Sequence, residues 1–111
     1  MHRVVVTHHV PSYQLVAPEF RGSRINGAFT VELADYIAVS GIDYWIYGHS
    51  HRNIDKTIGS TRCLCNQFGY VSHNEHLTFD RGKVIELLSR NVSWCYGVLQ
   101  MKSYSYYQQA G

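Results

Sequence analysis

Two histidines stand two positions apart directly after an apolar, β-prone run. Residues 45–47 form that run, Gly48 ends it, and His49 and His51 follow. In extended backbone, side chains two residues apart point the same way, with roughly 6–7 Å between their backbones. Imidazole is a good ligand for Zn, Mn and Fe. The pair could therefore share one metal ion or reach two neighbouring ions, although a pair of exposed loop histidines gives the same pattern.

A second histidine pair, His8 and His9, follows the short β-branched run Val4–Val6 and precedes Pro11. The run suits a strand buried on both faces, and the proline stops regular strand pairing. Adjacent side chains on an extended segment face opposite ways, so we expect only one of the two histidines to face a site. The other is expected to face substrate, to support the site from behind or to pack.

The segment between these runs predicts a helix over residues 30–40. Leu33 and Ile37 lie on an apolar stripe at helical spacing, Thr30 is a possible N-cap and Gly41 a stop. Strand, helix and a second strand over 43–47 make a βαβ crossover, whose two strands are parallel.

Parallel strands joined by a crossover end at the same edge of their sheet, where open α/β sheets bind ligands. His8 and the pair His49 and His51 are therefore expected to meet at that edge. Farther along, residues 54–58 and 61–65 flank Gly59 and Ser60 and predict a β-hairpin. The expected fold class is thus α/β, with a mixed sheet.

The predicted domain covers residues 1–88, with a last strand over 82–88, and a Tyr-rich extension covers 89–111. Asn66 stands just past a strand, where it is expected to hold a loop through backbone hydrogen bonds. Residues 13–28 show no period and predict a long loop, of the kind that is often functional.

Three polar residues of that loop, Arg21, Arg24 and Asn26, are our candidates for substrate binding. Guanidinium groups offer planar, bidentate donors to phosphate, although two solvated arginines are the alternative reading. The net charge of +2 is small and the basic residues are scattered, so we expect no nucleic-acid partner. No apolar run approaches the length of a membrane span, and three cysteines without a secretory signal favour a reducing, cytoplasmic setting.

Several histidines at one sheet edge fit metal-assisted hydrolysis, in which a metal ion acidifies bound water and polarises a phosphoryl oxygen. Charge is the difficulty, because neutral imidazoles do not offset two divalent ions. Asp43 begins its predicted strand and so lies at the opposite edge, and Asp55 is a weak candidate.

Three segments, 4–12, 48–51 and 65–70, stand in the order found in the calcineurin-like metallophosphoesterases, and the chain resembles a bacterial branch of that superfamily over roughly residues 3–88. The resemblance implies a binuclear site in which metal-bound hydroxide attacks phosphorus. His8 and His49 would then bind one metal ion and His51 the other, with Mn, Fe, Zn or Ni as possible ions. His9 would act on the catalytic or substrate side, and Asn66 and Gly69 would shape a loop.

The Asp-x-His, Gly-Asp-x-x-Asp and Gly-Asn-His motifs of that superfamily do not occur in the chain. The resemblance therefore covers only a C-terminal half, that is, half of a metallophosphoesterase-type β-sandwich. We expect a phosphate-ester substrate, a missing N-terminal half and little hydrolysis by the chain alone. Two alternatives stay open: a non-catalytic remnant that serves binding or self-association, and a structural zinc protein that uses Cys63 and Cys65.

Overall fold

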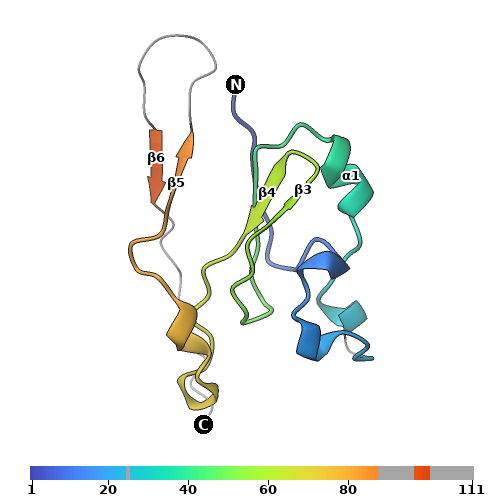
Figure 1. Cartoon of the computed structure of the whole chain (residues 1–111), viewed down its shortest axis with the longest axis vertical. Coiled ribbons are helices and arrows are strands. Elements are labelled where there is room, and N and C mark those ends of the chain that lie inside the picture. The colour runs from blue at the N-terminus through green and yellow to red at the C-terminus, as the bar shows by residue number, and fades with distance from the viewer. Residues whose placement is uncertain (25, 88–96, 101–111) are drawn as a thin grey trace.

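A mixed four-stranded sheet forms the centre of the computed structural model, which describes residues 1–24, 26–87 and 97–100 (Figure 1). The sheet has the strand order β1-β2-β4-β3, and a second sheet pairs β5 with β6. The α/β class is therefore as predicted. The strands are β1 (Val4–Val6), β2 (Tyr44–Ile46), β3 (Lys56–Ile58), β4 (Thr61–Leu64), β5 (Val84–Leu87) and β6 (Gly97–Gln100), and the helix is α1 (Ala34–Val39).

The predicted crossover is confirmed by the strand pairing. β1 runs parallel to β2, with Val4 opposite Tyr44 and Val6 opposite Ile46. β2 in turn runs parallel to β4, so three strands end at the same edge. β1 is one of the two outer strands of the four-stranded sheet, and Val6 is 70% exposed, which corrects the expectation of a strand buried on both faces.

The helix α1 is shorter than the predicted range 30–40. Thr30 forms a parallel bridge with Val10 and is not the N-cap. Instead, the Glu32 carboxylate accepts a hydrogen bond from the amide of Ala34 at 2.9 Å. Such a bond satisfies one of the amides that a helix start leaves without a partner. Ile37 is buried in the core, as the apolar stripe predicted.

The predicted hairpin is present: β3 and β4 pair antiparallel, with Ile58 opposite Thr61. Gly59 has a φ of +61°, and a Cβ on it would lie 2.5 Å from the carbonyl oxygen of Ala38. This turn therefore requires glycine, both for its backbone angle and for the close approach of α1 (Figure 1).

The core lies between the sheet and the segments that cross its face. Trp45, at the middle of β2, is 5% exposed, and both Cys63 and Cys65 are fully buried. The buried cluster comprises Val10, Leu15, Val16, Ile37, Ile42, Trp45, Tyr47, Ile58, Cys63 and Cys65.

The long loop expected over residues 13–28 contains three short 3-10 turns, which corrects that expectation. They are η1 (Tyr13–Leu15), η2 (Pro18–Phe20) and η3 (Asn26–Ala28). Two more, η4 (Val71–His73) and η5 (Glu75–Thr78), lie between β4 and β5. The predicted last strand is present as β5. The strand β6 falls within the predicted extension and pairs antiparallel with β5. The aromatic positions of that extension, Trp94 and the tyrosines at 96, 104, 106 and 107, lie outside the described residues.

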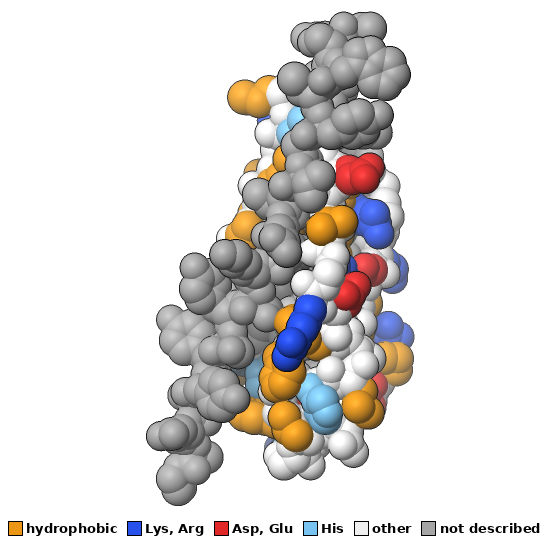
Figure 2. Space-filling model, turned by 90° about the vertical axis from the view of Figure 1, so that its left-hand side faces the viewer, with side chains coloured by type: hydrophobic (Ala, Val, Ile, Leu, Met, Phe, Trp, Pro, Cys, Tyr) orange, Lys and Arg blue, Asp and Glu red, His pale blue; other side chains and the backbone are white. Residues whose placement is uncertain are grey.

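Charged side chains of both signs are interspersed with hydrophobic ones on the described part of the face that Figure 2 shows. Within the described ranges, no helix has the length and apolar character needed to cross a bilayer.

Candidate metal centre

Three histidines gather at the carboxyl edge of the parallel strands. One nitrogen from each of His8, His9 and His49 lies within 4.8 Å of the others. His8 Nε2 and His49 Nδ1 are 2.8 Å apart, which is hydrogen-bond distance. His8 comes two residues after β1 and His49 three residues after β2, so the meeting of these two loops at one edge follows from the crossover.

Backbone and side-chain hydrogen bonds fix the two loops to each other. The amide of Gly48 donates to the carbonyl of His8 at 3.1 Å. The indole of Trp45 donates to the Thr7 hydroxyl at 3.0 Å, and that hydroxyl donates to the carbonyl of His9, also at 3.0 Å. A buried residue of β2 therefore holds the chain turn that presents His8 and His9.

The expectation that only one of His8 and His9 faces the site is wrong in this structure. Their rings lie 5.1 Å apart between centroids, and both belong to the group with His49. The reason is that the backbone bends at these residues instead of continuing as a strand, so the alternation of an extended chain does not apply.

The extended geometry assumed for His49 and His51 is also wrong. Their φ angles are +67° and +54°, in the left-handed region. The amide of Ser50 donates to the carbonyl of Gly48 at 2.8 Å, which closes a three-residue turn around His49. Non-glycine residues adopt positive φ at a cost of roughly 1–3 kcal/mol, and such residues cluster at functional sites.

His51 is not part of the three-histidine group; it pairs with a carboxylate. Its Nδ1 lies 3.1 Å from Oε2 of Glu75, and its ring meets that of Tyr70 edge to face at 4.7 Å. Arg52 donates to the other oxygen of Glu75 at 3.3 Å. No sequence pattern pointed to Glu75, because a 3-10 turn 24 residues beyond His51 supplies it.

Gln67 is a second residue that the sequence patterns did not reveal. Its side-chain oxygen accepts the amide of His51 at 2.8 Å, and its Nε2 donates to the Ser50 hydroxyl and to the carbonyl of Arg52, each at 3.0 Å. The backbone of Gln67 is tied to the side chain of Asn53 in both directions. The side chain of Gln67 therefore fixes the loop that carries His49 and His51.

Asn66 makes the loop-fixing bonds that were expected of it. Its side chain donates to the carbonyl of Asp80 at 2.7 Å and accepts the amide of Asp80 at 3.0 Å. Gly69 has a φ of +65°, and a Cβ there would lie 2.5 Å from Cβ of Glu75. Both residues therefore shape the segment that brings Glu75 to His51.

The candidate substrate residues lie on an exposed segment. Arg21 and Arg24 are both exposed, and the Arg21 guanidinium donates to the carbonyl of Val16 at 3.4 Å. Arg52 joins this segment to the His51 loop, because it pairs with Glu19 at 2.9 Å and lies 5.3 Å from the ring centre of Phe20. Asn26 begins η3, and its side chain lies outside what the structure describes.

Partial burial lowers the pKa of His49, and the neighbouring His8, His9 and His51 lower it further. These neighbours favour the neutral imidazole, which is the form that binds metal ions. A tetrahedral ion with Zn–N bonds of 2.0–2.1 Å needs nitrogens roughly 3.4 Å apart. The nitrogens of His8 and His49 are closer than this spacing, at 2.8 Å, and the whole group lies within 4.8 Å, so small shifts of these exposed side chains in either direction reach it. The donor set therefore fits one transition-metal ion.

No carboxylate completes this group among the described residues. Asp43 accepts the amide of Arg3 at the opposite end of β2, and both oxygens of Asp55 bind the Lys83 ammonium at 3.0 Å. No cysteine joins the group either, and burial raises the pKa of Cys63 to about 11. The described residues therefore give the structural zinc alternative no support.

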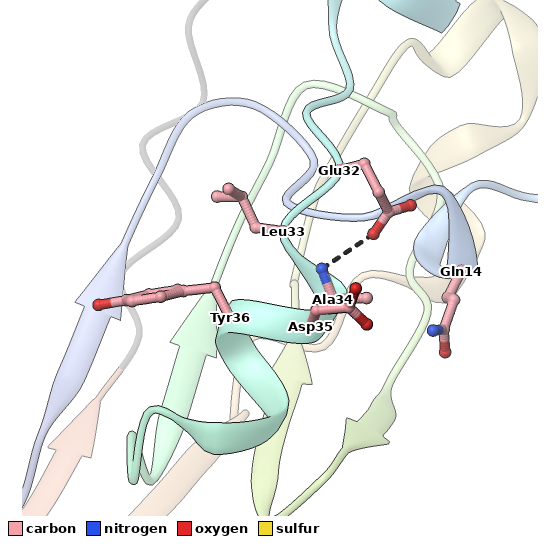
Figure 3. Close-up of a pocket in the computed structure, with 6 residues that line it drawn as sticks. All are labelled: Gln14, Glu32, Leu33, Ala34, Asp35 and Tyr36. Carbon is pink, nitrogen blue, oxygen red and sulfur yellow. Dashed lines mark hydrogen bonds between the residues drawn. The ribbon is translucent and has the colours of Figure 1, made fainter.

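A pocket of about 290 Å³ lies elsewhere, beside the start of α1 (Figure 3). It is lined by Gln14, Glu32, Leu33, Ala34, Asp35 and Tyr36, with no histidine among them. Figure 3 shows Glu32 bonded to the amide of Ala34, and its carboxylate also accepts Ser12 Oγ and the Tyr13 amide. Glu32 therefore has a structural role, which is to stabilise the start of α1.

No protein-family model matches the chain, and no curated protein or solved structure matches it.

Proposed function

We propose that this chain supplies the histidine-bearing part of a metal-dependent phosphoric ester hydrolase. The observation that carries the proposal is the group His8, His9 and His49 at the carboxyl edge of parallel strands. Three imidazoles of this kind would bind a Zn, Fe or Ni ion, or an Mn ion that has further oxygen ligands. Such an ion would lower the pKa of bound water and polarise a phosphoryl oxygen.

The metal-binding and substrate-binding roles fall on different residues in this proposal. His8 and His49 bind the ion, His9 completes the group or acts on the substrate, and His51 serves a second metal position. Arg21, Arg24 and Asn26 are the candidate phosphate contacts. Asn66 and Gly69 maintain the segment beside His51.

The proposed architecture is half of a metallophosphoesterase-type β-sandwich. The described residues contribute no carboxylate to the histidine group, so two divalent ions would be poorly neutralised. Weak metal binding and slow hydrolysis by the chain alone are expected, and an acidic partner segment would raise both. A reducing, cytoplasmic setting belongs to the same proposal and is supported by the free, buried thiols of Cys63 and Cys65.

The test measures Zn²⁺ and Mn²⁺ binding by titration calorimetry, together with hydrolysis of a phosphomonoester and a phosphodiester. We expect His49→Ala to weaken metal binding at least tenfold and to abolish any metal-dependent hydrolysis. The matched control is His73→Ala, because His73 is exposed and lies outside the group. Equal metal affinity in wild type, His49→Ala and His73→Ala would refute the metal site.

A non-catalytic module that associates through the sheet is the second candidate. It is favoured by the outer strand β1, which has no second strand partner among the described residues and whose Val6 is 70% exposed. Open strand edges pair readily with other chains. Sedimentation velocity of wild type and Val6→Lys separates the two candidates. A charge on β1 should prevent self-association through this strand and leave metal binding unchanged.

A further inference from the structure

Glu75 and His51 form a pair that the histidine group does not include. Oε2 of Glu75 lies 3.1 Å from Nδ1 of His51, and the two side chains are 11% and 33% exposed. The pair is thus shielded on the side of the carboxylate and more open on the side of the imidazole. This arrangement leaves the far nitrogen of the ring, Nε2, as the one that the carboxylate does not engage.

The carboxylate has little freedom to move away. Its Oε2 also accepts the amide of Tyr70 at 2.6 Å, and its Oε1 accepts Nη1 of Arg52 at 3.3 Å. Gly69 admits it, because a Cβ at that position would come within 2.7 Å of Oε2. The position of Glu75 is therefore determined by three donors and one glycine.

The donors around Glu75 decide which partner holds the proton. Its Oε2 accepts the Tyr70 amide and its Oε1 accepts the Arg52 guanidinium, a setting that suits a carboxylate. An ionised carboxylate can only accept hydrogen bonds, so Nδ1 of His51 must donate. In a neutral imidazole that donates through Nδ1, Nε2 carries the lone pair.

We propose that Glu75 is a positioning residue that holds His51 as the Nδ1–H tautomer and thereby presents Nε2 to a metal ion. The assignment of Nε2 to a metal rests on the proposed function, whereas the tautomer does not. Metal-binding histidines commonly donate their other nitrogen to a carboxylate, and loss of that partner typically weakens metal affinity 10- to 100-fold. Glu75 matches this role in residue type and in geometry.

The experiment reads the tautomer from ¹⁵N–¹H correlation spectra of the histidine side chains at pH 8, without metal. Wild type should show His51 as Nδ1–H. Glu75→Ala should move His51 toward Nε2–H, and Glu75→Gln should restore Nδ1–H because the amide oxygen still accepts. Glu19→Ala is the matched control: it removes another partner of Arg52 without touching His51, and should leave the tautomer unchanged.

A wild-type His51 in the Nε2–H form overturns the inference, and this result does not depend on whether any variant folds. Zn²⁺ titration then tests the ligand role: the His51 Nε2 signal should shift while Nδ1–H persists, and Glu75→Ala should need at least tenfold more Zn²⁺. A Zn²⁺ shift at Nδ1, or Zn²⁺ bound to other histidines with His51 unchanged, also overturns it. A chain in which no histidine responds to Zn²⁺ contradicts the proposed function instead, and the tautomer result still stands.

Discussion

His49 has a strained backbone, and its side chain contacts several other residues of the site. Its φ is +67°, its Nδ1 meets His8, and its ring lies 5.5 Å from that of Phe29. A residue chosen only for stability at this angle would be glycine, which adopts positive φ without a steric penalty. The imidazole is therefore retained at a cost in stability, which is common where a side chain has a function.

This strain predicts that His49→Gly is more stable than His49→Ala, by about 1 kcal/mol, because alanine keeps the Cβ that disfavours the left-handed conformation. Urea unfolding measures the difference. The matched pair is His73→Gly and His73→Ala, where the order should reverse, because His73 lies in the 3-10 turn η4 at ordinary φ. Equal stabilities for the two His49 variants would show that the backbone relaxes in solution.

The sequence allowed the meeting of His8 and His49 to be predicted, since parallel strands joined by a crossover end together. It did not allow His9 to be placed with them, because a bend after β1 replaces the alternation of a strand. The partner of His51 was beyond prediction as well. Glu75 lies in a turn that no hydrophobic period marks, and only the tertiary fold brings it to His51.

The elements themselves were predictable to the extent that local patterns decide them. β1 has the predicted bounds, and the hairpin follows from the glycine turn at Gly59. α1 was predicted four residues too early at its start, because Thr30 bonds across to Val10 instead of capping a helix. Glu32 takes over that task, and it also accepts hydrogen bonds from Ser12 and Tyr13 at the start of η1.

Glu32 therefore gives a prediction for the start of α1. Burial acts to raise its pKa, but the bonds from the Ala34 amide, the Ser12 hydroxyl and the Tyr13 amide outweigh burial and lower it. A carboxylate with a lowered folded-state pKa stabilises the fold above its unfolded-state pKa, and this stability is lost as pH falls through the folded value. Glu32→Gln should reduce the unfolding free energy by about 1 kcal/mol at pH 6.

The difference between wild type and Glu32→Gln should shrink toward zero as pH falls below 4.5 and through the lowered folded-state pKa of Glu32. Urea unfolding at several pH values measures it. Asp35→Asn is the control, since Asp35 is an exposed carboxylate in the first turn of α1, and its effect should be smaller. A constant difference across this pH range would contradict a role for the charge of Glu32.

Over the whole molecule, the segment between β4 and β5 connects the four-stranded sheet, the histidine loop and the second sheet. It supplies Gln67 to the backbone of His51 and Glu75 to the ring. At its far end, Lys83 binds Asp55 and the carbonyl of Cys65. In Figure 1 this segment descends from β4 and returns upward to β5. The site therefore depends on how firmly the segment is closed.

Asn66 closes that segment through its two bonds to Asp80, and its side chain is buried, with the residue 8% exposed. Asn66→Ala removes both bonds, so the Asp80 amide loses its side-chain acceptor while the Asp80 carbonyl keeps the Lys83 amide as a donor. The unfolding free energy should therefore fall by about 1 kcal/mol. Hydrogen exchange should accelerate at the amides of β5 and of residues 67–75, while β1 and β2 stay protected, because regions can open separately within one fold.

Ser72→Ala, an exposed change within the same segment, is the control and should leave the exchange rates near those of wild type. If Asn66→Ala accelerates exchange equally in β1, β2 and β5, the molecule opens as a single unit and the segment is not a separate closing element. If only the segment opens, metal binding by His8 and His49 should survive the substitution while the response of His51 is lost, because the three-histidine group is built on the parallel strands and Glu75 is not.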